Sequence, residues 1–329
     1  MKNADQGMML AVRVSLVCNA ILFTIKGITL VVVNSLAVAA DLGISFVALG
    51  ISILLYYAIK MSNRPADVFH NYGYGKIENV AEAIEGVILI GLALAMSFQA
   101  ILHLIRVGEV SSPIIGFICS FLGIAINFWG ANFILKLAEK HASPALRAEG
   151  IHFRLEGFIS LAITLSFALV IVLHRVGLFT PAKYVDPVAT LIVSAFITFP
   201  SVRLLREAFM KLLDASIGES GQMDVIKALA RHFDSYCNFK EVRTRTAGRK
   251  QFVDIHLVVP AHSSVKNAHT ISAALKHEIA STLSDSEVTV HMEPCTGSCA
   301  YTRNGRPCPY MQEREFKETG AMSGDRLKS

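Results

Sequence analysis

Long apolar stretches separated by short polar loops dominate the first two thirds of this chain. Windows of about 20 apolar residues, the length that spans a bilayer, fall near residues 9–32, 35–59, 79–105, 112–137, 150–174 and 184–210. Six membrane helices are therefore predicted. The first window lacks a small-residue cleavage site and is too long for a signal-peptide core, so we expect it to remain as a span.

Beyond about Leu213 the apolar positions alternate over short segments. This pattern predicts a helix near 220–234, strands at 239–246 and 251–259, a helix at 266–283 and a strand at 287–293. Such an order favours a small α+β domain, with an open sheet and two helices on one face. We expect a transmembrane domain over 1–212, this soluble domain over 213–294, and a flexible, cysteine-containing tail over 295–329.

Composition agrees with a polytopic membrane protein. Hydrophobic residues make up 53% of the chain, charged residues only 17%, and the mean hydropathy is +0.47. Loops on the side of the N-terminus carry more basic residues than the opposite loops, so both termini are predicted to be cytoplasmic. The richer side has Lys60, Arg64, Lys76, Lys136, Lys140 and Arg147, and the poorer side has Arg106, Arg175 and Lys183.

Charge and cysteine content exclude two further classes. The formal charge of +5 follows from the inward bias and the tail, and no basic run interleaved with aromatic residues indicates nucleic acid. Of the six cysteines, Cys18 and Cys119 lie in apolar spans and the other four lie in the cytoplasmic part, where thiols stay reduced. No disulfide framework is expected.

The fifth window contains the most informative polar pair. His152 and Glu156 are four residues apart, so both project from one face of a membrane helix. Ionisable groups within a span usually serve ion movement or charge pairing. An imidazole and a carboxylate one turn apart also match the donors of a divalent transition metal. The alternative is a local His–Glu ion pair near the start of the helix.

Several motifs occur in the order NSLAVAAD, RPADVFHNYGYGKIE, ALRAEGIHFRLE, VDPVATL and DIHLVVP. Over roughly residues 10–294 the chain resembles a cation diffusion facilitator. The resemblance implies a six-helix transporter rather than an enzyme, usually a homodimer, in a bacterial inner membrane. It would exchange Zn²⁺, Fe²⁺, Mn²⁺ or a similar ion for protons without an organic cofactor. Its cytoplasmic domain would have a ferredoxin-like, metallochaperone-like fold.

The resemblance places half of the family's transport site on His152 and Glu156, with Glu in place of the usual Asp. The second-helix half falls on Ile44 and Ala48, which have no metal donors. Asp41 precedes Ile44 by one turn, about 4.5 Å along the axis. A displaced site is therefore predicted, rich in oxygen donors and suited to Mn²⁺ or Fe²⁺. Its candidates are Asp41, Ser45, Glu149, His152 and Glu156. Alternatively, Asp41 and Glu149 are proton relays or packing acids.

Two other groups match family ligands in part. In the loop after the second helix, Asp67 and His70 match two of three ligands, but Tyr74 holds the third position, which favours a structural or proton-linked role. In the soluble domain, three donors can converge on one sheet face, and the alternative is a set of surface histidines on a dimerising sheet. These donors are His256, His291 and Glu293, with His269 as a further family ligand and Lys240 in a position that often holds His.

Three function hypotheses follow from these features. The first is proton-driven export of a divalent cation from the cytoplasm. The second, based on Ile44 and Ala48, is a transport-silent partner or metal sensor. The third is a metal-storage module built on Cys295, Cys299 and Cys308, whose spacing fits neither a zinc ribbon nor a ferredoxin. We expect structural roles within the bundle for Lys26, Glu82, Glu85, Asn127 and Asn132.

Overall fold

The computed structural model describes residues 2–33, 36–106, 113–283 and 285–296, and the chain divides into two compact units. The membrane unit contains α1 (Lys2–Val33), α2 (Leu36–Ser62), α3 (Lys76–Arg106), α4 (Pro113–His141), α5 (Pro144–Arg175) and α6 (Phe179–Leu212). The soluble unit contains α7 (Glu219–Arg231), the 3-10 helix η1 (Phe233–Ser235), β1 (Asn238–Ala247), β2 (Lys250–Val259), α8 (Val265–Thr282) and β3 (Ser286–Pro294).

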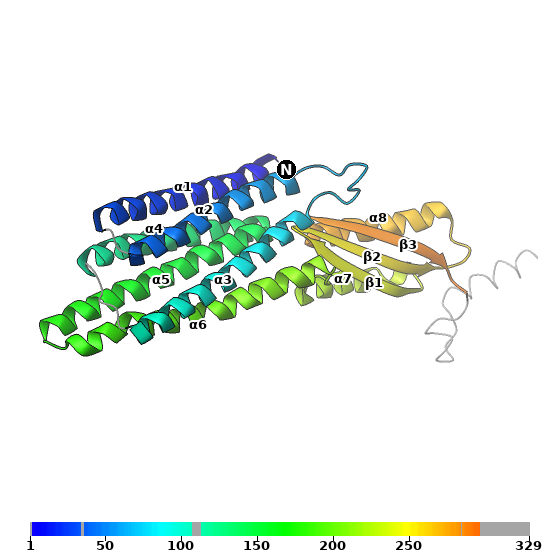
Figure 1. Ribbon diagram of the computed structural model, residues 1–329. Coiled ribbons are helices and arrows are strands. Elements are labelled where there is room, and N and C mark those ends of the chain that lie inside the picture. The colour runs from blue at the N-terminus through cyan, green and yellow to red at the C-terminus, as the bar shows by residue number, and fades with distance from the viewer. Residues whose placement is uncertain (1, 34–35, 107–112, 284, 297–329) are drawn as a thin grey trace, which may run out of the picture. The chain divides into compact units, whose positions relative to one another are not determined.

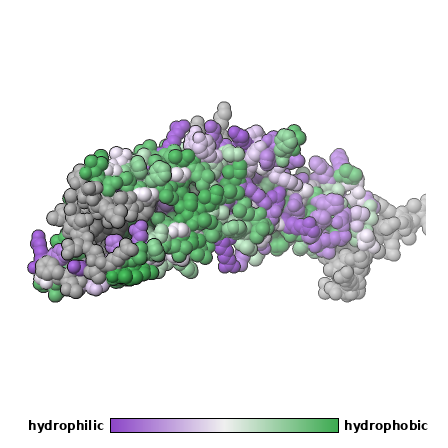
Figure 2. Space-filling model, in the orientation of Figure 1, coloured by the Kyte–Doolittle hydropathy of each residue, from purple (hydrophilic) through white to green (hydrophobic). Residues whose placement is uncertain are grey.

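Within the described residues, six helices are long and apolar enough to cross a membrane, which confirms the predicted number. They lie roughly side by side as a bundle (Figure 1). Apolar side chains cover much of the visible face of these helices (Figure 2). Because lipid solvates this surface, exposed apolar side chains such as Phe46, Phe98 and Phe199 are expected on it.

Glycines bring α4 and α5 into close contact. A Cβ at Gly150 of α5 would lie 2.6 Å from Leu135 Cγ of α4, and a Cβ at Gly130 of α4 would lie 2.9 Å from the Phe153 ring of α5. Small residues at such positions let two membrane helices pack with their backbones close together. This packing fixes the rotation of α5 and directs the His152 face away from α4, toward the other helices of the bundle.

The start of α5 is also fixed by local chemistry. Ser143 is the N-cap, and its hydroxyl accepts a hydrogen bond from the backbone N–H of Leu146. Pro144 occupies the first helical turn, where its missing N–H costs nothing. The Ser143 hydroxyl in turn donates to Glu78 Oε2 of α3 at 2.5 Å. The axial position of the polar face of α5 is therefore set by its cap and by a contact with α3.

The soluble unit is the α+β domain predicted from the sequence, and its sheet has the strand order β1-β2-β3. Strands β2 and β3 are parallel, and His256 pairs with His291 across them. The alternate residues Val253, Ile255 and Leu257 of β2 are buried. They share one hydrophobic cluster with residues of both α7 and α8, so both helices pack on the same side of the sheet, as predicted. His256 lies on the opposite face because it alternates with these core positions.

Candidate metal centres

One face of α5 carries three ionisable side chains at i, i+3 and i+7: Glu149, His152 and Glu156. Their exposed fractions are 0%, 2% and 7%. Helical spacing places all three on the same stripe, and the glycine packing against α4 turns this stripe inward. Ionisable groups inside a span are costly unless they meet a cation or a partner, so this stripe is the strongest candidate site in the membrane unit.

The imidazole of His152 lies between two carboxylates. Its Nε2 is 3.2 Å from Glu156 Oε1, and its Nδ1 is 3.9 Å from Glu85 Oε1 of α3. Both ring nitrogens and both of these oxygens are buried and make no hydrogen bond. Burying polar atoms without hydrogen bonds costs free energy in a folded protein. A bound cation would give these nitrogens and oxygens a partner.

Glu149 belongs to a polar network between α1, α2 and α5. Its Oε1 accepts hydrogen bonds from the hydroxyls of Ser15 and Ser52, the second at 2.7 Å. Asn19 Nδ2 donates to Ser52 Oγ at 2.7 Å. Glu149 Oε2 is buried and makes no hydrogen bond. Oε1 therefore links the three helices through hydrogen bonds, and Oε2 is available to a cation or a proton.

The α2 side of the predicted membrane site is described only in part. Ala48 is 1% exposed and Ser45 is 3% exposed, so both face the interior of the bundle. Asp41 lies within α2, but its side chain and that of Ile44 lie outside the described side chains. The displaced site with Asp41 and Ser45 therefore stays a prediction. Ala48 supplies only a methyl group toward the interior.

The loop between α2 and α3 is held by its own hydrogen bonds. Asp67 Oδ1 accepts from the backbone N–H groups of Phe69 and His70, and Oδ2 accepts from the Tyr74 hydroxyl at 2.6 Å. The Tyr74 hydrogen bond and then the His70 N–H lower the pKa of Asp67. Because both carboxylate oxygens accept hydrogen bonds from within the loop, this geometry supports the structural role favoured for the loop, and metal binding by Asp67 and His70 stays untested.

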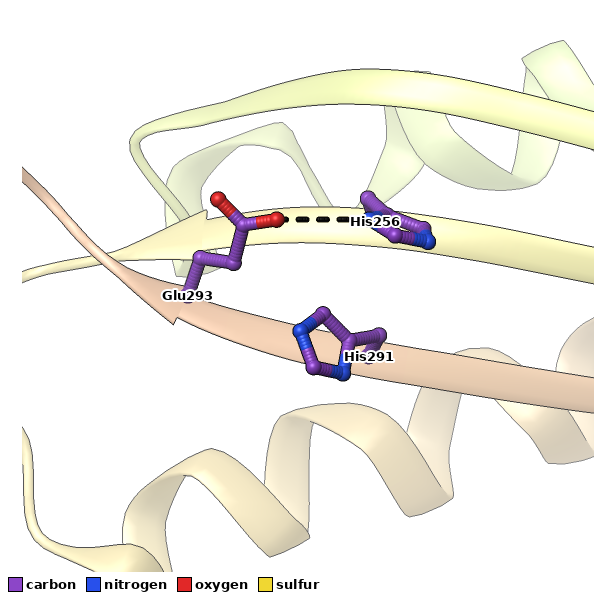
Figure 3. A group of neighbouring side chains, drawn as sticks. All are labelled: His256, His291 and Glu293. Carbon is purple, nitrogen blue, oxygen red and sulfur yellow. Dashed lines mark hydrogen bonds and ion pairs between the residues drawn. The ribbon is translucent and has the colours of Figure 1, made fainter.

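In the soluble unit, His256, His291 and Glu293 come together on one sheet face (Figure 3), with ligand atoms within 4.8 Å of one another. The two imidazole centroids are 4.9 Å apart, and His256 Nδ1 is 3.3 Å from Glu293 Oε1. Parallel pairing of His256 with His291 produces this arrangement. Two imidazoles and a carboxylate are a set that zinc accepts, with one position left open.

Lys240 of β1 reaches the same group. Its ammonium donates to Glu293 Oε2, the carboxylate oxygen that does not face His256. This hydrogen bond and then that of His256 lower the pKa of Glu293. His269 lies on the exposed side of α8 and is not part of the three-donor group. Cys299 and Cys308 lie outside the described residues, so the cysteine tail stays a prediction.

Glu85 of α3, for which the sequence analysis expected a structural role, lies next to His152 in the structure, and sequence spacing on α5 alone did not place it there. A signal was available, since Glu78, Glu82 and Glu85 follow i, i+4 and i+7 spacing and so share one face of α3. Their environments differ. Glu82 pairs with Lys211 at 2.9 Å, whereas Glu85 Oε1 is near His152 and makes no hydrogen bond.

Within the described residues, six helices long and apolar enough to cross a membrane carry inward imidazole and carboxylate side chains and are followed by an α+β domain, as in a polytopic membrane protein. A family model described as the cation efflux transmembrane domain matches residues 12–213, and one described as the cation efflux protein cytoplasmic domain matches residues 219–295. The chain belongs to this family, that of the cation diffusion facilitators.

Individual relatives match most of the chain. An uncharacterized transporter of Synechocystis sp. is 26% identical over 263 residues, 80% of this chain and 83% of the relative. The cation-efflux pump FieF of Cronobacter sakazakii is 25% identical over 264 residues, 80% of this chain and 85% of the pump. A solved structure, the metal-bound C-terminal domain of the CzcD transporter from Thermotoga maritima, is 29% identical; it covers 25% of this chain and 99% of that chain, with a TM-score of 0.23.

Proposed function

We propose that this protein is a secondary transporter that exports Zn²⁺, Fe²⁺ or Mn²⁺ from the cytoplasm in exchange for protons. The observation that carries the proposal is the buried stripe on α5, where His152, Glu156 and Glu149 present atoms without hydrogen bonds. The similarity to the FieF cation-efflux pumps supports cation export. The cation is the substrate, and no covalent step or organic cofactor is required.

Charge balance supports exchange rather than simple binding. Glu85, Glu149 and Glu156 are all buried, and buried carboxylates need positive charge or protons nearby. A divalent cation and a pair of protons carry the same charge, so either can occupy this site and each displaces the other. Inward movement of protons down their gradient would then drive the metal outward by alternating access.

The donor set favours the harder end of the transition series. The described donors are one imidazole and carboxylates, and the predicted contribution of Asp41 adds another oxygen. A site that is rich in oxygen donors favours Mn²⁺ and Fe²⁺ over Zn²⁺. We further propose that both termini are cytoplasmic, because basic residues concentrate in the loops on the side of the N-terminus. Membership of the cation efflux family supports a homodimer in a bacterial inner membrane.

Metal-dependent proton flux in proteoliposomes that contain only this chain tests the proposal. With a pH-sensitive dye inside the vesicles, adding Mn²⁺, Fe²⁺ or Zn²⁺ outside is expected to change the internal pH. Vesicles without protein are the control. If the chain binds metal but produces no flux, the result favours a transport-silent partner or sensor, the alternative that Ile44 and Ala48 suggest. Heterodimer formation with an active relative would then be the next measurement.

A separate prediction concerns the soluble unit, where Lys240 competes with a metal for Glu293. Replacing it in Lys240→Met removes the competing ammonium, so the His256, His291 and Glu293 group should bind Zn²⁺ more tightly. Equilibrium dialysis of the full chain measures the change, and His256→Ala with His291→Ala should remove this bound ion. Equal occupancy in the wild type and Lys240→Met would show that the ion pair does not oppose binding.

The same pair has a defined pH dependence. The folded-state pKa of Glu293 is lowered, chiefly by the Lys240 hydrogen bond. Its contribution to stability is therefore fully present above the ordinary carboxyl pKa of about 4.3 and is lost as the pH falls through the lower folded-state pKa. Near neutral pH, Glu293 stays ionised. Its titration should therefore not change the effect of Lys240→Met on metal affinity.

A further inference from the structure

Two helices present a carboxylate to one imidazole, each at a different ring nitrogen. Glu156 of α5 faces Nε2 of His152 at 3.2 Å, and Glu85 of α3 faces Nδ1 at 3.9 Å. His152 is 2% exposed and Glu85 is 3% exposed, so water competes little for these atoms. The two carboxylates can therefore have different roles: one can share a cation with the imidazole, and the other can act on the opposite ring nitrogen.

Geometry assigns different roles to the two carboxylates. The two nitrogens of an imidazole point away from each other, and a metal lies in the ring plane about 2.0–2.1 Å from the nitrogen that binds it. An ion on Nε2 is therefore near Glu156 and on the far side of the ring from Glu85. Glu85 cannot contact that ion while the ring keeps its present orientation.

We propose that Glu85 is a positioning residue for the transport site, and this inference rests on the proposed function. With a cation on Nε2, Glu85 Oε1 would accept a hydrogen bond from the Nδ1–H of His152. That contact selects the tautomer whose Nε2 lone pair faces Glu156 and the cation. Metal-binding histidines commonly give their other N–H to a carboxylate, which fixes the ring and increases its donor strength.

The separation of 3.9 Å is longer than a hydrogen bond. A cation on Nε2 withdraws electron density from the ring and makes Nδ1–H a stronger donor, so the contact should shorten when the ion binds. The contrast with Glu82 supports a role in the site. Glu82 lies one turn away on the same helix and pairs with Lys211, whereas Glu85 Oε1 makes no hydrogen bond.

Calorimetric titration of Mn²⁺ and Zn²⁺ into the detergent-solubilised full chain is the first test. The chain should carry His256→Ala and His291→Ala, so that the three-donor group of the soluble unit does not contribute to the signal. Glu85→Leu is expected to weaken binding by about 10–100-fold. Glu85→Gln keeps an amide oxygen that can accept the hydrogen bond, and its loss should be smaller. The matched control is Glu82→Gln with Lys211→Gln, which removes a buried pair on the same helix and should leave the affinity unchanged.

A spectroscopic test separates positioning from a purely structural role. In NMR spectra of the Zn²⁺-loaded, ¹⁵N-histidine-labelled chain, Nε2 of His152 should carry no proton and bind the metal. Nδ1 should carry a proton that is strongly hydrogen-bonded. Its signals are assigned by their absence in His152→Gln. Glu85→Gln, which keeps the shape of the side chain, should shift that Nδ1 proton upfield. A protonated Nε2 in the loaded wild type, or unchanged affinity in both Glu85 variants, would overturn the proposal.

The two proposals fail in different ways. If the wild-type membrane unit binds neither Mn²⁺ nor Zn²⁺ and supports no flux, the transport function is wrong and the role of Glu85 falls with it. If the wild type binds and transports while Glu85→Leu and Glu85→Gln match it, only the positioning role is wrong.

Discussion

Replacing His152 with alanine is expected to abolish metal-driven proton flux. The side chain is buried, and it is the only imidazole among the described donors on the α5 stripe. Under the proposed function, its removal deletes a metal ligand, and it leaves Glu85 and Glu156 without the ring that separates them. Losing one charged or coordinating group in a dry site typically costs several kcal/mol, which corresponds to a loss below detection in a vesicle assay.

The displaced-site hypothesis predicts that Asp41→Asn has nearly the same effect, because Ile44 and Ala48 provide no donors from α2. Metal-driven proton flux of both variants and of the wild type is measured in vesicles of the same composition. His277→Ala is a suitable control, since this histidine is exposed on α8. Flux that survives Asp41→Asn with His152 intact would rule out the displaced site and leave Asp41 as a packing or relay acid.

The double variant Ile44→Asp with Ala48→Asp is expected to shift ion preference toward Zn²⁺. The family resemblance aligns these two positions with the second-helix donors, and on that alignment two added carboxylates together with His152 and Glu156 would rebuild a four-ligand tetrahedral set of the kind that zinc favours. Because Ala48 is 1% exposed, at least one new carboxylate would be buried. The ratio of Zn²⁺-driven to Mn²⁺-driven flux in vesicles measures the change.

A stability measurement accompanies this test. Without metal, the added buried charges should lower the melting temperature of the double variant, and Zn²⁺ should restore it by binding the folded state. Ile44→Asn with Ala48→Asn is the matched control, since the amides are similar in size but carry no charge. An unchanged flux ratio in the aspartate variant would show that α2 does not face the ion at these positions.

The fold could be predicted because two different periodicities mark its two parts. Continuous apolar windows identified the helices of the membrane unit, and alternation in QFVDIHLVVP and EVTVHMEP identified the strands. The same alternation placed His256, His291 and Glu293 on one face, and parallel pairing of β2 with β3 brings them together. In a sheet, a period of two fixes which side chains share a face, so this group followed from sequence spacing.

The membrane site could be predicted only along a single helix. Spacing places His152 and Glu156 on one stripe of α5, but it does not say which residue of another helix lies opposite. The approach of Glu85 depends on how α3 packs beside α5, and that packing is set by tertiary contacts such as the bond from Ser143 to Glu78. A carboxylate at Glu85 and one at Glu82 look alike in the sequence, and their neighbours in the structure distinguish them: Lys211 beside Glu82 and His152 beside Glu85.

The glycine contacts between α4 and α5 also restrict how a transport cycle can proceed. Sliding α5 by one helical turn against α4 would bring Leu146 or Arg154 to the place of Gly150, where even a Cβ would be 2.6 Å from Leu135 Cγ. We therefore expect the two helices to move together during a transport cycle, with His152 and Glu156 carried on this pair. On this expectation, opening toward either side of the membrane would come from α1, α2, α3 or α6 moving against the α4–α5 pair.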